Sequence, residues 1–469
     1  MDDIRPLSDQ IQSRLERLGD ERRRRIADRL RAVSEQLGMW MTDEETDETR
    51  TVPMTVQPTL VDPATEGYLH HAAWQMRLAL QRLPDVIAED PAAAGLLEMS
   101  EAEHDWFNAY KSPMLGPDSR FCRVDALFRN TQGSRPAHLK FIEPNVVGLG
   151  GMCYAVDTVQ LLAEHILPEL VDQPVSLTAQ PGDDPRELLF RELLDFSRAR
   201  GAGQEPTVAI VGSRSGYETD GEDARLIDWL GGRGLDALFA DPGELELADD
   251  GAIVADGRRI SFIFRTMELS DLVEREEKEG RLDALRTAFE RDLVAPSVGG
   301  DLEHKCVFEL FTSEQFAHHF TPGQRRVFDQ HVLWTRLVAD RRTNAPHGPT
   351  VHLPNYIRSH RRDLVLKPNR SYGGSGVLIG KHTDPEEWRQ ALAKGLSDES
   401  DLVVQQLAGL VRDRLPVPHQ GTLENRSVYT VIGIFPSRHG VGLLGRYSDD
   451  SVVNVSLDGG VVPFMIDFS

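Results

Sequence analysis

Cysteine is scarce in this chain of 469 residues. The three cysteines, Cys122, Cys153 and Cys306, are widely separated and odd in number. Their spacing fits neither a disulfide framework nor a cysteine-based metal site. We therefore expect reduced, buried thiols and a cytoplasmic protein.

Long apolar runs and an excess of positive charge are also lacking. No stretch approaches about eighteen consecutive apolar residues, and the first residues, MDDIRPLSDQ, lack the apolar core of a signal peptide. The formal net charge is −23, whereas nucleic acids and anionic membranes attract basic surfaces. The sequence thus predicts a protein with neither nucleic-acid nor membrane partners.

Several catalytic motifs are absent as well. The chain has no GxxxxGK[ST] phosphate-binding loop and no GxSxG nucleophile motif. The segment VGSRSGYE, residues 211–218, places glycines after an expected strand, but it lacks the GxGxxG spacing. We therefore do not expect NAD binding there.

The most informative segment is DLVLKPNRSYGGSG, residues 363–376. It predicts a buried strand that carries Lys367 into a glycine-rich loop. A lysine supplies a point charge, and glycines let backbone amides approach phosphate oxygens closely. The segment predicts a polyphosphate site, and the alternative is a tight hairpin turn with a surface lysine.

A second informative segment spans residues 121–151. FCRVDALFRN and AHLKFIEPNVVGLGG have the composition of two strands, joined by the polar loop TQGSRP, and predict a hairpin. Arg123 and Asp125 are two residues apart and share one face of the first strand. Glu143 and Asn145 share one face of the second strand in the same way.

This predicted hairpin carries oxygen ligands suited to a metal ion. Carboxylates and amides are the hard ligands that Mg²⁺ accepts together with nucleotide phosphates. Pro144 disfavours a central, fully paired position and favours a strand end that opens onto a site. The alternative is a sheet face that carries only ion pairs.

Together the two segments resemble the circularly permuted branch of the ATP-grasp superfamily, as in eukaryotic glutathione synthetase and glutathionylspermidine synthase. In that branch an RxD strand and an ExN strand precede the lysine–glycine loop. This chain has RVD at 123–125, EPN at 143–145, a glycine run at 148–151, and then KPNRSYGG from Lys367. The resemblance covers residues 105–469.

Four weaker segments add to the resemblance. ISFIFRTMELSDL (260–272) resembles a strand with an arginine ahead of the ATP-binding half, and LEHKCVFELFT (302–312) contains a lysine similar to a second ATP-contacting lysine. VVQQL (403–407) resembles the hinge strand beside adenine, and GRYSDDSVVNVSLDGG (445–460) resembles the terminal arginine and glycine-rich loop.

The resemblance implies a composite site for ATP, Mg²⁺ and an acid substrate. The implied ATP contacts are Lys305, Lys367, Ser371, Gly373, Gly374, Gly376, Gln405 and Gln406. The implied metal ligands are Asp125, Glu143 and Asn145. The implied catalytic residues are Arg123 and Arg446, and the implied substrate contacts are Arg123, Gly150, Gly151 and Arg265.

The chain departs from the family pattern in its glycine-rich loop. Glutathione synthetase carries a metal-binding glutamate there, whereas this chain has Ser371 and Tyr372. Asp125, as in the glutathionylspermidine relatives, becomes the better candidate for the third metal ligand. No amidase domain precedes the synthetase region, so we expect no bifunctional synthetase/amidase.

The expected fold class is α/β with several lobes, namely a permuted ATP-grasp with an inserted Rossmann-like domain. The length allows roughly two to four domains. Residues 8–40 and 67–112 have helical periodicity, and from Thr207 a β-α-β pattern begins. The expected divisions are an N-terminal helical region (1–104), the RxD/ExN part of the core (105–204), a substrate-side α/β domain (205–300), and the ATP-binding lid with the C-terminal ATP-grasp segment (301–469).

The activity implied by the resemblance is ATP-dependent ligation of a carboxylate to an amine through an acyl phosphate, with release of ADP and phosphate. The expected partners are a small acid and an amine of amino-acid, peptide or polyamine type. Whether the protein forms a homodimer is left open by the sequence. The alternatives are another ATP-grasp outcome, such as phosphotransfer or thioester formation, and a non-catalytic binding protein that kept the fold.

Overall fold

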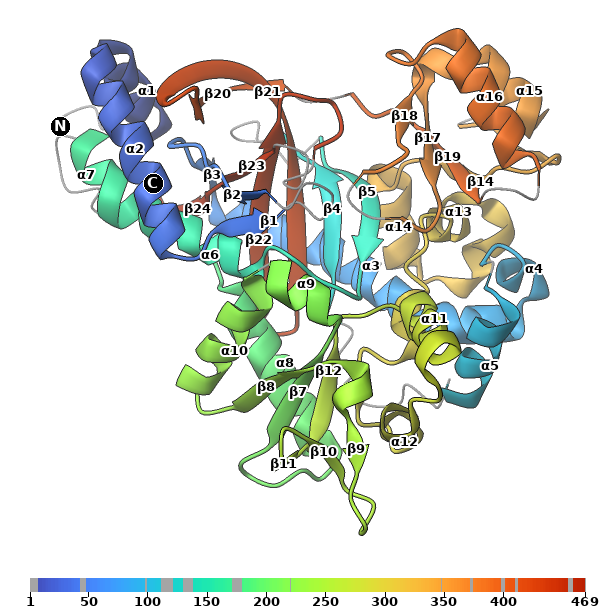
Figure 1. The fold of residues 1–469 in the computed structure, drawn as a ribbon. Coiled ribbons are helices and arrows are strands. Elements are labelled where there is room, and N and C mark those ends of the chain that lie inside the picture. Colours follow the sequence, from blue (N-terminus) through green and yellow to red (C-terminus); the bar gives the residue numbers. More distant parts are fainter. Residues whose placement is uncertain are drawn as a thin grey trace.

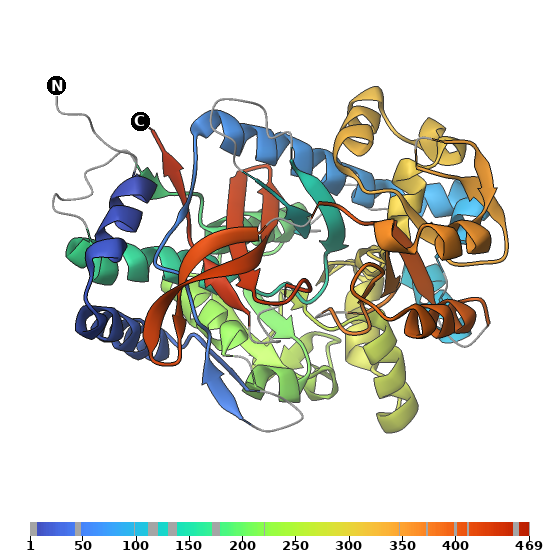
Figure 2. The same cartoon turned by 90° about the horizontal axis from the view of Figure 1, so that it is seen from above.

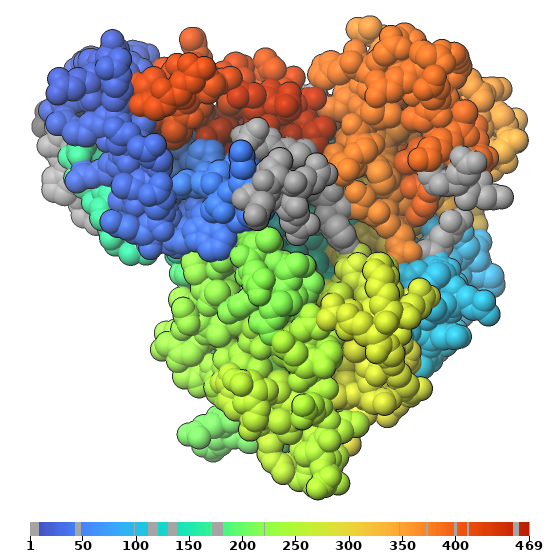
Figure 3. Space-filling model, in the orientation of Figure 1, coloured from blue at the N-terminus to red at the C-terminus, as the bar shows by residue number. Residues whose placement is uncertain are grey.

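The computed structural model describes residues 7–42, 48–97, 99–110, 121–129, 138–170, 179–219, 221–346, 348–371, 374–397, 401–409, 412–453 and 459–468. Figures 1 and 3 show three lobes. One contains both ends of the chain (blue and red), the second contains the segment drawn in green and yellow, and the third contains the segment drawn in orange. The fold is a mixture of helices and strands, as the sequence predicts.

A six-stranded antiparallel sheet occupies the first lobe. Its strand order is β23-β22-β21-β4-β5, and β20 also pairs with β21. The strands are β4 (Arg123–Leu127), β5 (Lys140–Asn145), β20 (Arg412–His419), β21 (Thr422–Ser437), β22 (Gly440–Ser448) and β23 (Gly460–Val462). The predicted antiparallel pairing of RVD with EPN is confirmed, because Arg123 lies opposite Asn145 and Asp125 opposite Glu143. β5 is the edge strand, which explains how it accommodates Pro144.

The central sheet separates two hydrophobic cores. Alternate residues of a strand point to opposite faces, and on β21 Ile432 and Ile434 belong to one core while Phe435 belongs to the other. The long helix α3 (Pro63–Glu89) covers the first face (Figures 1 and 2). The second core is covered by α1 (Leu7–Arg17), α2 (Asp20–Gln36), α6 (Met152–Leu161), the π-helical turn η1 (Leu162–Ile166), α7 (Leu167–Leu170) and α8 (Pro185–Ala199).

Helix α3 shows why this part of the sequence is helical. Asp62 caps its first turn by accepting a hydrogen bond from the Thr65 amide at 2.7 Å. Leu69, Met76 and Leu80 recur at helical spacing and are buried. The helical prediction for residues 67–112 is met by α3, α4 (Pro91–Ala94) and α5 (Glu101–Tyr110), and residues 111–112 lie outside the described part.

The second lobe contains a parallel sheet with the strand order β13-β12-β7-β8. The strands are β7 (Thr207–Val211), β8 (Asp236–Ala240), β12 (Phe262–Arg265) and β13 (Val294–Ala295). Its helices are α9 (Arg214–Thr219), α10 (Glu222–Gly232), the short η2 (Pro242–Glu244), α11 (Leu269–Glu279) and α12 (Asp283–Glu290). A small second sheet is formed by β9 (Glu246–Leu247), β10 (Ile253–Ala255) and β11 (Arg258–Arg259). The predicted β-α-β unit is confirmed as β7, α10 and β8.

The third lobe is built on an antiparallel sheet with the order β14-β19-β17-β18. The strands are β14 (Thr335–Leu337), β17 (Leu364–Pro368), β18 (Leu378–Ile379) and β19 (Leu402–Gln406). Around them lie η3 (Val298–Asp301), α13 (Val307–Thr312), η4 (Glu314–His319), α14 (Pro322–His331), the hairpin β15 (Arg342–Asn344) and β16 (Thr350–His352), α15 (Leu353–Ser359), η5 (Arg361–Asp363) and α16 (Pro385–Gly395). The buried strand predicted to carry Lys367 is therefore confirmed as β17.

The remaining strands tie distant parts of the chain together. They are β1 (Trp40–Thr42), β2 (Thr49–Thr51), β3 (Thr59–Val61), β6 (Ala179–Pro181) and β24 (Phe464–Asp467). β24 lies between β3 and β6, so the C-terminal strand pairs with a strand that precedes α3. None of the helices in the described part of the chain is long and apolar enough to cross a membrane.

Candidate active site

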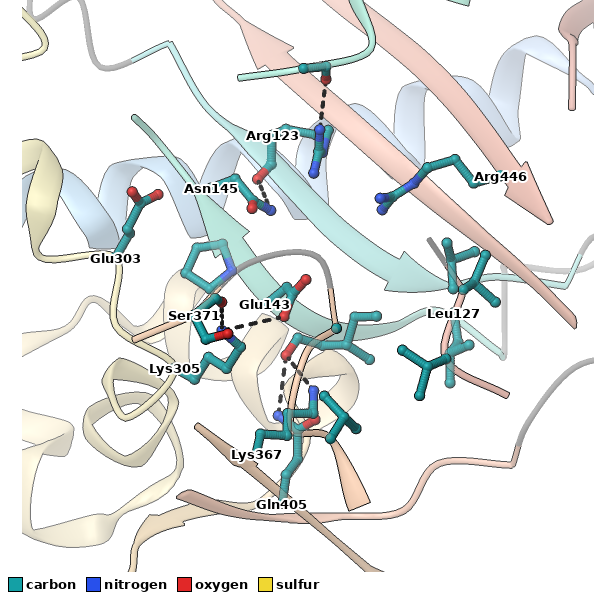
Figure 4. Close-up of a pocket in the computed structure, with 18 of the residues that line it drawn as sticks. Arg123, Leu127, Glu143, Asn145, Glu303, Lys305, Lys367, Ser371, Gln405 and Arg446 are labelled. Atoms are coloured by element: carbon teal, nitrogen blue, oxygen red, sulfur yellow. Dashed lines mark hydrogen bonds and ion pairs between the residues drawn. The ribbon is translucent and has the colours of Figure 1, made fainter. Parts of the chain in front are cut away.

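A cavity of about 510 Å³ lies where the three lobes meet. The central sheet contributes β4, β5 and β22 to its walls, and the third lobe contributes β17 and β19. The loop from Asp301 to Lys305 and the residue before α11, Glu268, also line it. Figure 4 shows Arg123 and Arg446 on one side, Lys305 and Lys367 on another, and Glu143 and Asn145 between them.

Arg123, Asp125 and Arg446 form a compact ion cluster beneath the cavity floor. Asp125 is fully buried, and its carboxylate accepts hydrogen bonds from Arg123 Nε at 2.8 Å, Arg123 Nη2 at 3.1 Å and Arg446 Nη2 at 2.6 Å. Burial alone would raise the pKa of Asp125, but the two guanidinium groups outweigh it and hold the pKa below its usual value. Asp125 therefore remains charged and fixes both arginines.

Asp125 was predicted as a metal ligand, but in this ion cluster its carboxylate faces the two arginines and not the cavity. Both of its oxygens are engaged by arginines, and it does not line the cavity, whereas Arg123 and Arg446 do. Arg123 is held further by its Nη1, which donates to the Gly150 carbonyl at 2.6 Å. The two arginines thus present their remaining surface to the cavity from a rigid base.

Glu143 and Asn145 both line the cavity, because they share one face of β5. Pro144, between them, is buried and also contributes to the cavity lining. Asn145 Nδ2 donates to the Arg123 carbonyl at 3.5 Å, and Glu143 lies 3.8 Å from Lys305 Nζ. The Asn145 amide oxygen and the Glu143 carboxylate are left as neighbouring oxygen donors.

An irregularity in β5 frees the carbonyl of Ile142 to accept hydrogen bonds from the third lobe. The pairing with β4 slips between Asp125 and Ala126, which leaves Ile142 without a partner on β4. The carbonyl of Ile142 instead accepts hydrogen bonds from Lys367 Nζ at 3.5 Å and Gln405 Nε2 at 3.3 Å. This carbonyl links the central sheet to β17 and β19 of the third lobe.

Lys367 is a buried cation with little compensation. The residue is 7% exposed, and among the described residues it takes part in no ion pair. Burial lowers its pKa to about 8, although the charge of Glu143 opposes the shift. Lys305, by contrast, donates to the Ser371 carbonyl at 2.6 Å. A buried ammonium facing a cavity is suited to an anionic ligand.

The glycine-rich loops adopt backbone conformations that glycine favours. Gly374 and Gly376 have φ values of +75° and +70°, and a Cβ on Gly374 would clash with Val452. Gly151 has a φ of +94° where α6 begins, and a Cβ there would clash with Leu444. Gly374, Gly150, Gly151 and Ser371 line the cavity, whereas Gly376 does not. Gly373 lies outside the described residues.

The two glutamines of β19 both line the cavity. Gln405 is buried, and its Nε2 also donates to the Thr335 hydroxyl at 3.0 Å. The structure therefore brings together the predicted residues Arg123, Glu143, Asn145, Gly150, Gly151, Lys305, Lys367, Ser371, Gly374, Gln405, Gln406 and Arg446.

Arg265 is the predicted substrate contact that the structure does not bring to the cavity. Its side chain is fully buried and pairs with Asp301 at 2.7 Å. It also donates to the carbonyls of Pro296, Met267 and Ser297. With these acceptors, the guanidinium links β12 to η3, and the contact of Arg265 with substrate stays a prediction.

Sequence reasoning missed a group of acidic residues on the cavity wall. Glu268, Asp301 and Glu303 all line the cavity, close to the predicted residues Arg265 and Lys305 in sequence. Burial, and then the charges of Asp301 and Asp271, raise the pKa of Glu268 to about 8. Burial, followed by the charge of Glu268, raises the pKa of Glu303 well above its usual value. The only signal in the sequence is the position of Glu303 two residues before Lys305.

The three cysteines are buried and unbridged, as predicted. Burial raises the pKa of the Cys153 and Cys306 thiols, so both stay protonated.

Comparison with known proteins gives relatives at low identity. No protein-family model matches the chain. It is 25% identical over 308 residues to a putative glutamate–cysteine ligase 2-3 of Frankia alni, and 25% identical over 309 residues to a putative glutamate–cysteine ligase 2-2 of Frankia casuarinae. The matches cover 63% of this chain but 33% and 32% of the relatives, so the chain spans about a third of their length.

A solved structure shares the fold over nearly the whole chain. A glutathione synthetase-like effector from Globodera pallida superposes with a TM-score of 0.61 and covers 96% of this chain and 98% of its own, at 11% sequence identity. A putative gamma-glutamylcysteine synthetase from Methylobacillus flagellatus gives a TM-score of 0.41 at 10% identity, too low to support an argument. The chain thus has a mixed α/β fold similar to that of the glutathione synthetase-like effector, and its sequence relatives are named as ligases.

Proposed function

We propose that this protein is an ATP-dependent ligase that joins a carboxylic acid to an amine through an acyl phosphate, on a circularly permuted ATP-grasp fold. The observation that carries the proposal is the convergence of Lys305, Lys367, Arg123 and Arg446 with the oxygen donors Glu143 and Asn145 on one cavity. The fold similarity and the names of the sequence relatives support it.

In this proposal the lysine side of the cavity binds the triphosphate. Lys367 is buried without an anionic partner among the described residues, so a phosphate oxygen would compensate its charge. Lys305 would contact the same phosphates. The glycine loop with Ser371, Gly373, Gly374 and Gly376 would close over them, and Gln405 and Gln406 on β19 would lie beside the base.

The residues present fit a magnesium ion shared with the nucleotide. Glu143 and Asn145 supply a carboxylate and an amide oxygen, and Mg²⁺ is commonly held by one or two such groups plus phosphates. When bound, the metal would neutralise charge on the phosphates. Asp125, which the sequence suggested as a third ligand, would instead orient Arg123 and Arg446, since both of its oxygens are engaged.

The arginines would guide the acid. A substrate carboxylate beside Arg123 and Arg446 would be turned toward the γ-phosphoryl group, and one of its oxygens would attack phosphorus to give ADP and the acyl phosphate. The amine then attacks the carbonyl carbon, and the bond to phosphate breaks. The arginines would stabilise the negative charge that develops on the carbonyl oxygen.

The direct test is a product assay with Mg·ATP and a panel of acids and amines. L-glutamate is the first acid to use, with L-cysteine, glycine or spermidine as the amine, because two relatives are named putative glutamate–cysteine ligases. The proposal expects acid-dependent formation of ADP, phosphate and an amide. Formation of AMP, a thioester or a phosphoester would point to other chemistry, and absence of ATP turnover with every acid would contradict the proposal.

Lys367 provides a prediction on nucleotide binding. Mg·ATP should raise the melting temperature of the wild-type protein, because a ligand at a hundred times its Kd stabilises by about 2.7 kcal/mol. Lys367→Ala should lose most of this response, since the substitution removes the buried charge that faces the phosphates. The measurement is a thermal-shift series at increasing Mg·ATP.

Lys394→Ala is the matched control, because Lys394 is an exposed lysine on α16 of the same lobe. It should respond to Mg·ATP like the wild type. An equal response from Lys367→Ala would show that Lys367 does not bind the nucleotide.

A further inference from the structure

The carboxylates Glu268, Asp301 and Glu303 form one wall of the cavity, which we call the acidic wall. They come from the start of α11, from η3 and from the loop that follows η3. In Figure 4 Glu303 and Arg446 lie at opposite ends of the view, with Asn145 between them. The cavity thus has an acidic region beside its cationic ones.

Two members of the acidic wall are satisfied by the protein itself. Asp301 accepts hydrogen bonds from Arg265 Nη2 at 2.7 Å and from the Leu269 amide at 2.7 Å. Glu303 accepts hydrogen bonds from the amides of Val146 and Val147. These contacts fix both carboxylates and help to position the backbone directly after Asn145.

Glu268 is the residue of the acidic wall whose carboxylate has no partner among the described residues. It occupies the N-cap position of α11 and its carbonyl accepts from the Leu272 amide, but its carboxylate makes no capping hydrogen bond and takes part in no ion pair with the described residues. The nearby cations are committed elsewhere: Arg265 pairs with Asp301, and Arg370 pairs with Glu103 through both of its terminal nitrogens. The Glu268 carboxylate therefore faces the cavity without a partner.

His304 supplies an independent observation on the same side of the cavity. It lines the cavity, is 6% exposed, and its Nδ1 has no hydrogen-bond partner in the described part of the chain. Burial, followed by the charge of Arg370, lowers its pKa to about 3, so the ring is neutral. Arg370 also influences Glu268, which places both side chains near the same arginine. A polar ligand with N–H groups would satisfy such a region.

We propose that the amine substrate binds as an ammonium ion against the acidic wall, and that Glu268 accepts the proton which this ammonium must lose before it attacks. This inference rests on the proposed ligase function and deepens it. It assigns the amine-side specificity to a cationic nucleophile, such as the amino group of an amino acid or a polyamine.

Proton transfer to Glu268 precedes formation of the amide bond. One N–H bond of the ammonium breaks, its electron pair stays on nitrogen, and the proton moves to a Glu268 oxygen. The nitrogen attacks the carbonyl carbon of the acyl phosphate, and the C–O bond to phosphate breaks. A second proton leaves the nitrogen and is taken up by the departing phosphate, so the products are the amide, hydrogen phosphate and protonated Glu268, which then returns its proton to solvent.

The surroundings of Glu268 suit a base that works near neutral pH. Burial, Asp301 and Asp271 raise its pKa to about 8, while Arg370 and Arg265 oppose the shift. Because the unprotonated form is the base, kcat/KM for the amine should rise with pH and level off above about pH 8. The raised pKa also means that the native state binds a proton more tightly than the unfolded chain does.

The test compares Glu268→Gln with wild type in two reactions that share the acyl phosphate. Both proteins receive Mg·ATP and L-glutamate, with either L-cysteine, glycine or spermidine as the amine, or hydroxylamine, which is uncharged near neutral pH and needs no base. We expect Glu268→Gln to lower kcat/KM for the amine by about 10²-fold and to lose the rising pH limb. Hydroxamate formation should persist, because the acyl phosphate is still made.

The matched control is Glu277→Gln, which changes an exposed carboxylate on the same helix and should behave like wild type in both reactions. Equal loss of amide and hydroxamate in Glu268→Gln, or no loss of either, would overturn the inference. The inference would also be overturned if wild type formed the hydroxamate but used none of the cationic amines. If wild type makes neither product and consumes no ATP with any acid of the panel, the proposed ligase function itself fails.

A stability readout separates proton binding at Glu268 from a general defect. Because its pKa is raised in the folded state, the contribution of Glu268 to stability should fall as pH rises from about 4.5 through about 8. Glu268→Gln should therefore melt like wild type near pH 5 and at a higher temperature than wild type above pH 8. A lower melting temperature of the variant at pH 8 would show that Glu268 has a structural partner.

Discussion

Replacement of Glu143 by glutamine is expected to lower ligase turnover by at least about two orders of magnitude, the scale of losing a group that stabilises charge on the reacting atoms. Glutamine keeps the volume of the side chain but removes its charge. Glu143 and Asn145 both line the cavity from β5, and the Glu143 carboxylate lies 3.8 Å from Lys305 Nζ. Asn145→Ala should cause a loss of similar size.

The measurement is steady-state turnover at increasing Mg²⁺, with melting temperature as the check on folding. Glu246→Gln is a suitable control, because Glu246 is an exposed carboxylate on β9 and does not line the cavity. Glu143→Gln should need more Mg²⁺ for half-maximal activity than wild type. Wild-type turnover of both Glu143→Gln and Asn145→Ala at limiting Mg²⁺ would remove these residues from the metal site.

Asp125→Asn is expected to destabilise the protein by about 3–5 kcal/mol, the usual cost of breaking a buried ion pair by removing one partner. Asp125 is fully buried and is the shared acceptor of Arg123 and Arg446, so its neutralisation leaves two partly buried guanidinium groups without their anion. Urea unfolding measures the change. Asp449→Asn, which breaks the exposed pair with Arg426, should cost only about 0–1 kcal/mol.

The same variant distinguishes two roles for Asp125. As a positioning residue it acts through the arginines, so Asp125→Asn should raise the apparent KM for the acid while the Mg²⁺ requirement stays as in wild type. As a metal ligand it would raise the Mg²⁺ requirement as Glu143→Gln does. Unchanged stability together with a raised Mg²⁺ requirement would contradict the ion cluster described above.

Local patterns in the sequence predicted the elements that carry the site. The apolar run before Lys367 gave β17, and the alternation in RVD and EPN gave an antiparallel pair with the correct faces. These predictions succeed because strand faces repeat every two residues and need no information from the rest of the chain. The positions of Glu143, Asn145 and Lys367 on the cavity follow from them.

Interactions between distant segments were not predictable in this way. Asp125 meets Arg446 across 321 residues of sequence, and only the pairing of β4 with β21 and β21 with β22 brings them together. Arg265 lies at the end of a strand near the site, yet its burial against Asp301 depends on how η3 packs. The acidic wall comes from separate turns that carry no shared pattern.

The most direct test of the central claim, that the protein activates a carboxylate through ATP, follows an oxygen atom. L-glutamate labelled with oxygen-18 in its carboxylates is incubated with Mg·ATP and L-cysteine, and the inorganic phosphate is analysed by mass spectrometry. If the product assay has identified another acid as the substrate, that acid carries the label instead. An acyl phosphate transfers one carboxylate oxygen to phosphate, so the account predicts labelled phosphate in equal amount to the ADP and amide. Unlabelled phosphate, or AMP and pyrophosphate in place of ADP, would contradict it.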